Sequence, residues 1–119
     1  MREFQNFAII VAAGKGLRME SKIKKQYIDL DKIPILARTI MAFDICDNLH
    51  EIVLVIPKQD HEYCKKHIID PFGFRKKIHL VKGGNKRQES VLNGLKRVSD
   101  RVTLDKEAIV LIHDGVRPF

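Results

Sequence analysis

The stretch FAIIVA at residues 7–12, followed directly by AGKG at residues 13–16, decides the fold class. A short apolar run with β-branched members is typical of a strand buried on both faces, as in a parallel sheet. The small residues after it end the strand and let the backbone pass close to a ligand. The start of the chain therefore predicts a buried parallel strand that leads into a glycine-bearing loop.

Three further apolar runs of the same kind each end at a proline, glycine or aspartate, and we expect strands over residues 51–56, 78–81 and 108–113. The helical spacing of apolar residues between the strands predicts three helices, over residues 34–46, 60–69 and 89–98. This alternation predicts one α/β domain over residues 1–119, with a doubly wound, mainly parallel sheet.

Some details of these elements can be read from single residues. Asp60 is expected to cap the helix that it begins. Cys46 and Cys64 lack a CxxC spacing and are expected to be two reduced and partly buried thiols. We expect the buried face of the helix over residues 89–98 to consist of four apolar residues, Val91, Leu92, Leu95 and Val98.

The chain is basic, with 22 Lys and Arg against 15 Asp and Glu and a net charge of +7. Such a charge can attract nucleic acid, a membrane surface or small polyanions such as nucleoside triphosphates. The positive residues are spread along the chain without the interleaved aromatic residues of a base-stacking platform, and no apolar run approaches the roughly 20 residues of a membrane span. The first six residues leave no room for a signal peptide. We therefore expect a cytoplasmic protein that binds neither nucleic acid nor membranes.

Segments rich in Gly, Arg or Asp follow the carboxyl ends of three predicted strands, over residues 12–25, 83–90 and 113–118. In open α/β sheets, ligands bind beyond these ends, near the point where the strand order reverses. We therefore expect the three segments to form one composite site.

The first segment combines small residues with positive charge. Backbone N–H groups over residues 12–16 can face phosphate oxygens, and Arg18 and Lys25 supply charge. The spacing is neither a Walker A loop nor GxGxxG, since Met19 stands at the third glycine position. The alternative is an ordinary glycine-bearing turn with solvated basic residues.

The second segment begins with two glycines, which allow a tight turn and expose backbone groups. Asn85, Ser90 and the backbone can hydrogen-bond to the edge of a pyrimidine ring. The alternative is a simple strand-to-helix connection with helix capping.

The third segment places Asp114 at the end of an apolar strand, where a carboxylate is a natural magnesium ligand. The alternative is a turn-forming residue before Gly115. The pair His113-Asp114 is also found in metal-dependent phosphohydrolases, but these need further histidines and aspartates in a helical array, and the other histidines lack that spacing.

The motifs occur in the order AAGxGxRM (residues 12–19), KQY (25–27), GGxxRxxSVxxGL (83–95) and HDGxRPF (113–119). This set resembles the 2-C-methyl-D-erythritol 4-phosphate cytidylyltransferases of the non-mevalonate isoprenoid pathway, over nearly the whole chain. The resemblance implies a Rossmann-like nucleotidyltransferase fold and a homodimeric full-length protein. It also implies transfer of a cytidylyl group from CTP to 2-C-methyl-D-erythritol 4-phosphate, with Mg²⁺ as cofactor and release of pyrophosphate. The alternative is a ribitol-5-phosphate cytidylyltransferase.

The resemblance also implies roles for individual residues. Arg18 and Lys25 would be catalytic and neutralise charge on the reacting phosphorus. Asp114 would hold the magnesium ion. The remaining matched positions would bind the nucleotide: Ala12, Ala13, Gly14 and Gly16 around its phosphates, Gly84, Asn85 and Ser90 at the cytosine, Arg87 in support of that loop, and Arg117 beside the aspartate.

Departures from the family pattern leave the polyol open. Lys24 replaces a proline before KQY, and Asn85 stands where some members carry aspartate. Val116, where alanine is more usual, resembles the related ribitol-phosphate cytidylyltransferases. Tyr27 does not, since those enzymes tend to carry phenylalanine at this position. Family members are also roughly twice this length. The resemblance therefore implies the N-terminal part of a longer enzyme with apolar surface exposed. The alternatives are an enzyme whose remainder is supplied elsewhere and an inactive truncated CTP-binding fragment.

Overall fold

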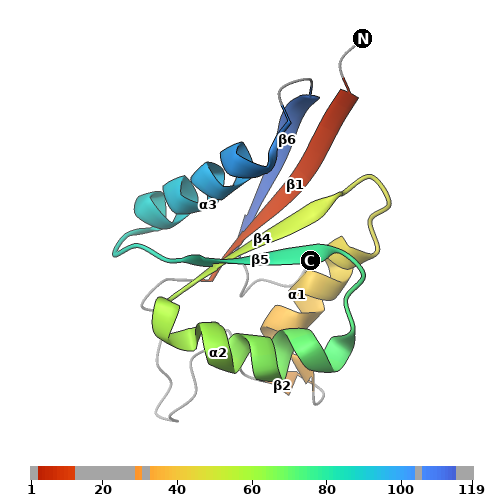
Figure 1. Cartoon of the computed structure of the whole chain (residues 1–119). Coiled ribbons are helices and arrows are strands. Elements are labelled where there is room, and N and C mark those ends of the chain that lie inside the picture. The colour runs from red at the N-terminus through yellow and green to blue at the C-terminus, as the bar shows by residue number, and fades with distance from the viewer. Residues whose placement is uncertain (1–2, 13–28, 31–32, 104–105, 115–119) are drawn as a thin grey trace.

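The computed structural model of the chain describes residues 3–12, 29–30, 33–103 and 106–114. Its central element is a four-stranded sheet of β1 (Glu3–Val11), β4 (Glu51–Ile56), β5 (Lys77–Lys82) and β6 (Lys106–Asp114), in the spatial order β5-β4-β1-β6. All three strand pairs are parallel. The predicted parallel sheet is confirmed (Figure 1).

The strand order reverses at β1. After β1 the chain adds β4 and then β5 on one side, and it crosses back to place β6 on the other side. A reversal of this kind opens a crevice at the carboxyl ends of the two strands that flank it, here β1 and β6. The topology therefore identifies one edge of the sheet as the place to look for a ligand site.

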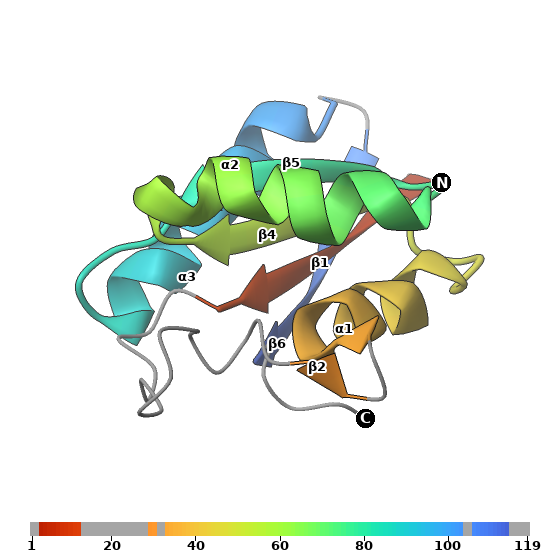
Figure 2. The same cartoon turned by 90° about the horizontal axis from the view of Figure 1, so that it is seen from below.

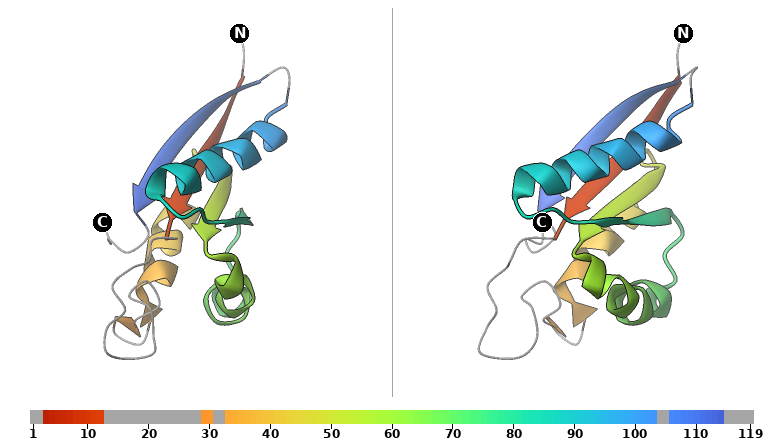
Figure 3. Two further views of the ribbon diagram at one scale, coloured as in Figure 1. Left: turned by 90° about the vertical axis from the view of Figure 1, so that its left-hand side faces the viewer. Right: turned by 60° about the vertical axis from the view of Figure 1, so that its left-hand side comes forward.

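Helices cover both faces of the sheet, which confirms the doubly wound α/β class (Figures 1 and 3). One face carries α1 (Ile35–Asp44) and an irregular helical segment, whereas the other carries α3 (Arg87–Arg101). The irregular segment consists of a 3-10 turn (Lys58–Asp60), α2 (His61–Cys64), a π turn (Lys65–Ile69) and a second 3-10 turn (Asp70–Phe72). A short antiparallel pair, β2 (Asp29–Leu30) and β3 (Ile33–Pro34), precedes α1. None of the helices in the described part of the chain is both long and apolar enough to cross a bilayer.

The two central strands supply the core. Alternate side chains of β1 and β4 point to opposite faces, so Ile10 and Leu54 pack with α1 and α2 while Ile9 and Val55 pack with α3. All four side chains are fully buried. The prediction of strands buried on both faces is confirmed for β1 and β4, because a helix layer lies on each side of them.

The same prediction is wrong for β6. Ile109, Leu111 and Ile112 are 46%, 55% and 44% exposed. In the described part of the chain β6 pairs only with β1, at the edge of the sheet, and the helices pack mainly over β1 and β4. Exposed apolar surface of the kind that the resemblance implies is therefore present along β6.

The buried face of α3 also differs from its prediction. Ser90, Gly94 and Val98 are buried at successive helical turns, whereas Leu92 and Leu95 are exposed. Gly94 decides this rotation, because a Cβ atom there would lie 2.9 Å from Cγ2 of Ile9. The helix therefore makes its closest approach to the sheet at the residue without a side chain, and the leucines turn outward.

Two smaller predictions are also corrected. Asp60 stands at the N-cap of α2, but its side chain makes no capping hydrogen bond. The preceding 3-10 turn gives Asp60 a helical backbone (φ −97°, ψ −5°) in place of the extended one that capping needs. The two thiols are unpaired, but Cys46 is exposed and Cys64 fully buried. Burial, with the nearby charge of Asp60, raises the pKa of Cys64 to about 12.

Candidate functional site

The carboxyl ends of β1 and β6 lie side by side where the strand order reverses. Val11 and Asp114 are partners in the β1–β6 register. The next residue, Ala12, is buried, and its N–H donates a hydrogen bond of 2.9 Å to the carbonyl of Val55 on β4. The backbone that leads into the first predicted ligand loop is thus fixed to the sheet, next to the aspartate that ends β6.

A tight turn over residues 83–86 joins β5 to α3. The N–H of Gly83 donates to the carbonyl of Ile56 at 2.9 Å, so the turn begins against the end of β4. The N–H of Gly84 then donates to Oγ of Ser90 at 3.0 Å. The turn is therefore held by the sheet at one end and by the first turns of α3 at the other.

Gly84 occupies a position that has no room for a side chain. A Cβ atom there would lie 2.3 Å from Cβ of Glu89 and 2.9 Å from its Oε2 atom. Real Cβ atoms do not approach other atoms this closely. The glycine is therefore required by the close contact between the turn and α3.

The second predicted segment divides into exposed and buried members. Asn85 and Arg87 are exposed and accessible to a ligand. Ser90 is 1% exposed, and its Oγ atom accepts the hydrogen bond from Gly84. Its hydroxyl hydrogen can still donate one further bond. The structure therefore places Ser90 beneath the turn as an anchor, and its contact with a base stays a prediction.

The turn between β5 and α3 and the carboxyl ends of β1 and β6 lie on the same side of the sheet (Figure 2), and Ala12 and Asp114 stand at those two strand ends. All four strands are parallel, so their carboxyl ends share that edge. The helix α3 begins there and returns across β4 and β1, with Gly94 against Ile9 and Val55. Ser90 lies one helical turn before Gly94 and so closer to the carboxyl ends of these strands. The structure thus brings together the described members of all three predicted segments.

The other predicted site residues lie outside the described part of the chain, and their placement stays a prediction. These residues are Ala13, Gly14, Gly16, Arg18, Lys25 and Arg117.

The chemistry of Asp114 fits a magnesium ion held together with a nucleotide. Mg²⁺ prefers oxygen ligands and is usually bound by one or two carboxylates, water and substrate phosphates. In the described residues no three His, Cys, Asp or Glu side chains are grouped to hold a metal on their own. The neighbouring His113 instead meets the ring of Phe43 edge to face, with ring centres 5.4 Å apart. A single carboxylate suits a metal that arrives with phosphate ligands.

Two further residues, which the sequence motifs do not single out, hold the turn. Oε2 of Glu89 accepts a hydrogen bond of 3.2 Å from the N–H of Asn85, and Nδ2 of Asn93 donates one of 2.9 Å to the carbonyl of Lys82. Glu89 is the third residue of α3, where a glutamate commonly reaches back to the backbone before the helix. This signal was hidden because the helix was predicted to begin at Glu89, whereas it begins at Arg87.

A second missed cluster fixes the other end of α3. Oε1 of Glu51, at the start of β4, accepts hydrogen bonds from Nε2 of His79 at 2.5 Å and Nε of Arg101 at 3.1 Å. Burial by itself raises the pKa of Glu51, but these hydrogen bonds and the charges of both partners outweigh it and hold the pKa below its ordinary value. The helix is thus tied to the sheet at the edge opposite the candidate site.

The fold is a Rossmann-like α/β domain, because its parallel sheet reverses strand order at β1. A glycine turn before α3 and an aspartate at the end of β6 lie where such domains bind their ligands. The profile of the 2-C-methyl-D-erythritol 4-phosphate cytidylyltransferase (IspD) family matches residues 7–119. The chain belongs to this family, which confirms the resemblance seen in its motifs.

Individual relatives agree with this assignment. The chain is 50% identical over 111 residues to 2-C-methyl-D-erythritol 4-phosphate cytidylyltransferase of Alkaliphilus oremlandii (93% of this chain, 45% of the relative). It is 44% identical over 112 residues to that of Geotalea uraniireducens (94% and 47%). The crystal structure of 4-diphosphocytidyl-2C-methyl-D-erythritol synthase from Anaerococcus prevotii superposes with a TM-score of 0.74 at 35% identity, covering 97% of this chain and 44% of that one. The chain thus spans about half the length of the relatives it matches.

Proposed function

We propose that this chain is the CTP-binding part of an enzyme that transfers a cytidylyl group from CTP to 2-C-methyl-D-erythritol 4-phosphate. The family profile and the relatives described above carry this activity in their names. The observation that carries the proposal for this chain is the shared edge of the sheet at Ala12, the Gly84 turn and Asp114. One triphosphate nucleotide can contact all three only because they lie at this edge.

The proposed reaction requires that the polyol phosphate be positioned in line with the α-phosphorus of CTP and that the negative charge around this phosphorus be neutralised. An oxygen of the polyol phosphate attacks the α-phosphorus of CTP, and pyrophosphate leaves as the new P–O bond forms. Arg18 and Lys25 offset the charge that gathers on this phosphorus, and the backbone over residues 12–16 donates to phosphate oxygens. Arg87 and Arg117 support the base-reading turn and the metal site respectively.

Magnesium would be held by Asp114 together with the triphosphate, and when bound it neutralises charge on the phosphate oxygens. We further propose that the full-length protein is a cytoplasmic homodimer, as the family resemblance implies. The basic composition, with a net charge of +7, favours association with small polyanions such as CTP and the polyol phosphate.

The test measures pyrophosphate release by the full-length protein that contains this chain. We expect release with CTP and methylerythritol phosphate, and much less with ribitol 5-phosphate. ATP and UTP, supplied with the preferred polyol phosphate, should be poor substrates. A preference for ribitol 5-phosphate would move the protein to the related branch, and equal rates with ATP or UTP would contradict the cytosine-reading role of the Gly84 turn.

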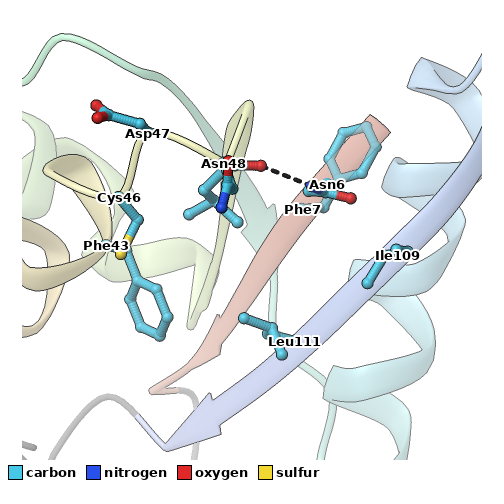
Figure 4. A pocket seen from close by; sticks show the side chains of 9 residues that line it. Asn6, Phe7, Phe43, Cys46, Asp47, Asn48, Ile109 and Leu111 are labelled. Carbon is cyan, nitrogen blue, oxygen red and sulfur yellow. Dashed lines mark hydrogen bonds between the residues drawn. The ribbon is translucent and has the colours of Figure 1, made fainter. Parts of the chain in front are cut away.

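A second candidate function is CTP binding without turnover by the chain on its own. A pocket of about 400 Å³ lies between the exposed face of β6 and the end of α1. Figure 4 shows Ile109 and Leu111 on one wall and Phe43 and Cys46 on the other, with Asn6 bonded to Asn48 at the rim. Such an open apolar surface is typical of a face on which further polypeptide packs.

Calorimetry and pyrophosphate release distinguish the two candidates. For the 119-residue chain alone, heat of CTP binding without pyrophosphate release supports a binding fragment. Turnover by this chain alone would show that the remaining half of the relatives is dispensable for the chemistry.

A further inference from the structure

Glu89 is placed to control the shape of the turn between β5 and α3. Its Oε2 atom accepts the N–H of Asn85 at 3.2 Å, while its Cβ lies directly against Gly84. One side chain thus contacts Gly84 and Asn85, two of the three residues to which the family resemblance assigns cytosine recognition. The carboxylate does not need to meet the nucleotide to affect its binding.

The contact belongs to a set of three from one helix. Glu89 holds Asn85, and Ser90 holds Gly84 through the bond to its Oγ atom. One turn further along α3, Asn93 donates to the carbonyl of Lys82 at the end of β5. The turn therefore follows α3 as a unit and does not move independently of it.

The helix itself is fixed against the sheet at two places. Gly94 packs directly on Ile9 and Val55, and Arg101 pairs with Glu51 on β4, whose side chain is only 13% exposed. The position of α3, and through Glu89 the position of the turn, is thus set by the core.

These contacts determine which groups the turn offers to a ligand. The backbone N–H groups of Gly84 and Asn85 already donate to side chains of α3. The backbone carbonyl oxygens of the turn and the side chain of Asn85 are therefore left to face a base. Carbonyl acceptors complement the exocyclic amine of cytosine, whereas uracil presents a carbonyl at the same position. Engaging the Asn85 N–H thereby disfavours uracil.

We propose that Glu89 is a positioning residue that fixes the Gly84–Asn85 turn and sharpens its preference for cytosine over uracil. This inference rests on the proposed function for its ligand. One part of the inference is purely structural: the Glu89 carboxylate accepts the backbone N–H of Asn85 and so holds the turn in place. This part can be measured without any nucleotide.

Two substitutions distinguish the effect of the length of the Glu89 side chain from the effect of its charge. Glu89→Gln keeps the length of the side chain and an oxygen that can accept from Asn85. Glu89→Asp keeps the charge but is one methylene shorter and cannot span the same distance. Glu62, an exposed glutamate in the first turn of α2, provides the matched control as Glu62→Asp.

The experiment combines amide hydrogen exchange of the 119-residue chain with calorimetry using CTP and UTP. We expect Glu89→Asp to speed exchange at Asn85 and to weaken CTP binding about fivefold, as for the loss of one modest hydrogen bond. The ratio of CTP to UTP affinity should also shrink. Glu89→Gln and Glu62→Asp should stay close to wild type in all three measurements, and thermal unfolding of each variant shows that it folds.

Wild-type exchange at Asn85 in Glu89→Asp, or an unchanged ratio of CTP to UTP affinity, would overturn the inference. An effect of equal size in Glu89→Gln would do the same, because it would assign the effect to charge. Failure of the wild-type chain to bind CTP would instead contradict CTP binding by this chain on its own, and the exchange measurement would still decide whether Glu89 holds the turn.

Discussion

The N–H of Gly84 donates a hydrogen bond of 3.0 Å to Oγ of Ser90, a side chain that is almost fully buried beneath the turn. A serine at this position therefore links the candidate base-reading turn to the helix behind it. The link is local, since Gly84 and Ser90 are only six positions apart along the chain, and it depends on a single hydroxyl group.

Ser90→Ala is expected to lower the free energy of unfolding by about 1 kcal/mol, because the Gly84 N–H loses its acceptor. CTP binding should weaken in parallel, since the turn is no longer fixed to α3. Urea denaturation and calorimetry with CTP measure the two effects. Ser99→Ala, at an exposed position of the same helix, is the control and should change neither. Wild-type stability and affinity in Ser90→Ala would show that the hydrogen bond is not needed.

Gly84→Ala and Gly73→Ala should have different consequences. A Cβ atom on residue 84 would lie 2.3 Å from Cβ of Glu89, so the turn must move, and we expect CTP to bind about tenfold more weakly. Gly73 has open space around it but a φ of +59°, and alanine there should cost about 1 kcal/mol of stability without changing CTP affinity. Equal CTP affinity of both variants would mean that the turn is not part of the site.

Asp114→Asn tests the metal. With the wild-type chain, removal of Mg²⁺ by EDTA should lower CTP affinity by about tenfold, which corresponds to about 1.4 kcal/mol. In Asp114→Asn the affinity for CTP should be low even with Mg²⁺ present, and removal of Mg²⁺ should hardly change it, because an amide is a poor substitute for a carboxylate ligand. Asp100→Asn, at an exposed position of α3, is the control. A Mg²⁺ response of wild-type size in Asp114→Asn would remove Asp114 from the metal site.

Composition was sufficient to predict the strands that are buried on both faces. Residues 7–12 and 51–56 are almost entirely apolar because β1 and β4 are covered by helices on each side, and burial of this kind leaves little choice of residue. Residues 108–112 of β6 are equally apolar, yet Ile109, Leu111 and Ile112 are exposed. An apolar composition indicates that a strand can be buried. Whether it is buried depends on whether another part of the protein packs against it.

The site residues that were missed act through geometry that sequence spacing does not contain. Gly84 and Asn85 were identified from their motif, but the dependence of the turn on Glu89 follows from where α3 begins. The contact between Glu51 and Arg101 joins residues 50 positions apart and arises only because α3 crosses β4. Long-range pairs of this kind cannot be read from local patterns.

The pH dependence of stability should report on Glu51. Its pKa is held below the ordinary glutamate value of about 4.3 in the folded state, so the unfolded chain binds the proton first as the pH falls. The stabilising contribution is complete above that ordinary value and is lost as the pH drops through the lower folded-state pKa. Glu51→Gln should lower the free energy of unfolding at pH 7 by roughly 1–3 kcal/mol. It should also flatten the loss of stability below about pH 4.5.

Urea denaturation from pH 7 to pH 3 measures this difference, with Glu62→Gln on the exposed face of α2 as the control. A parallel pH profile of wild type and Glu51→Gln would show that the hydrogen bonds from His79 and Arg101 do not stabilise the folded chain.

Because the apolar face of β6 is exposed, substitutions on it should affect self-association of the chain more than its stability. Leu54→Ala removes a fully buried side chain and should cost about 2–5 kcal/mol. Leu111→Ser changes a side chain that is 55% exposed, and it should cost less than about 1 kcal/mol while reducing self-association, because exposed apolar patches bring molecules together. Urea denaturation and sedimentation velocity measure the two quantities. If Leu111→Ser destabilised the chain as much as Leu54→Ala, the β6 face would be covered in solution, and the side chain of Leu111 would be part of a packed surface.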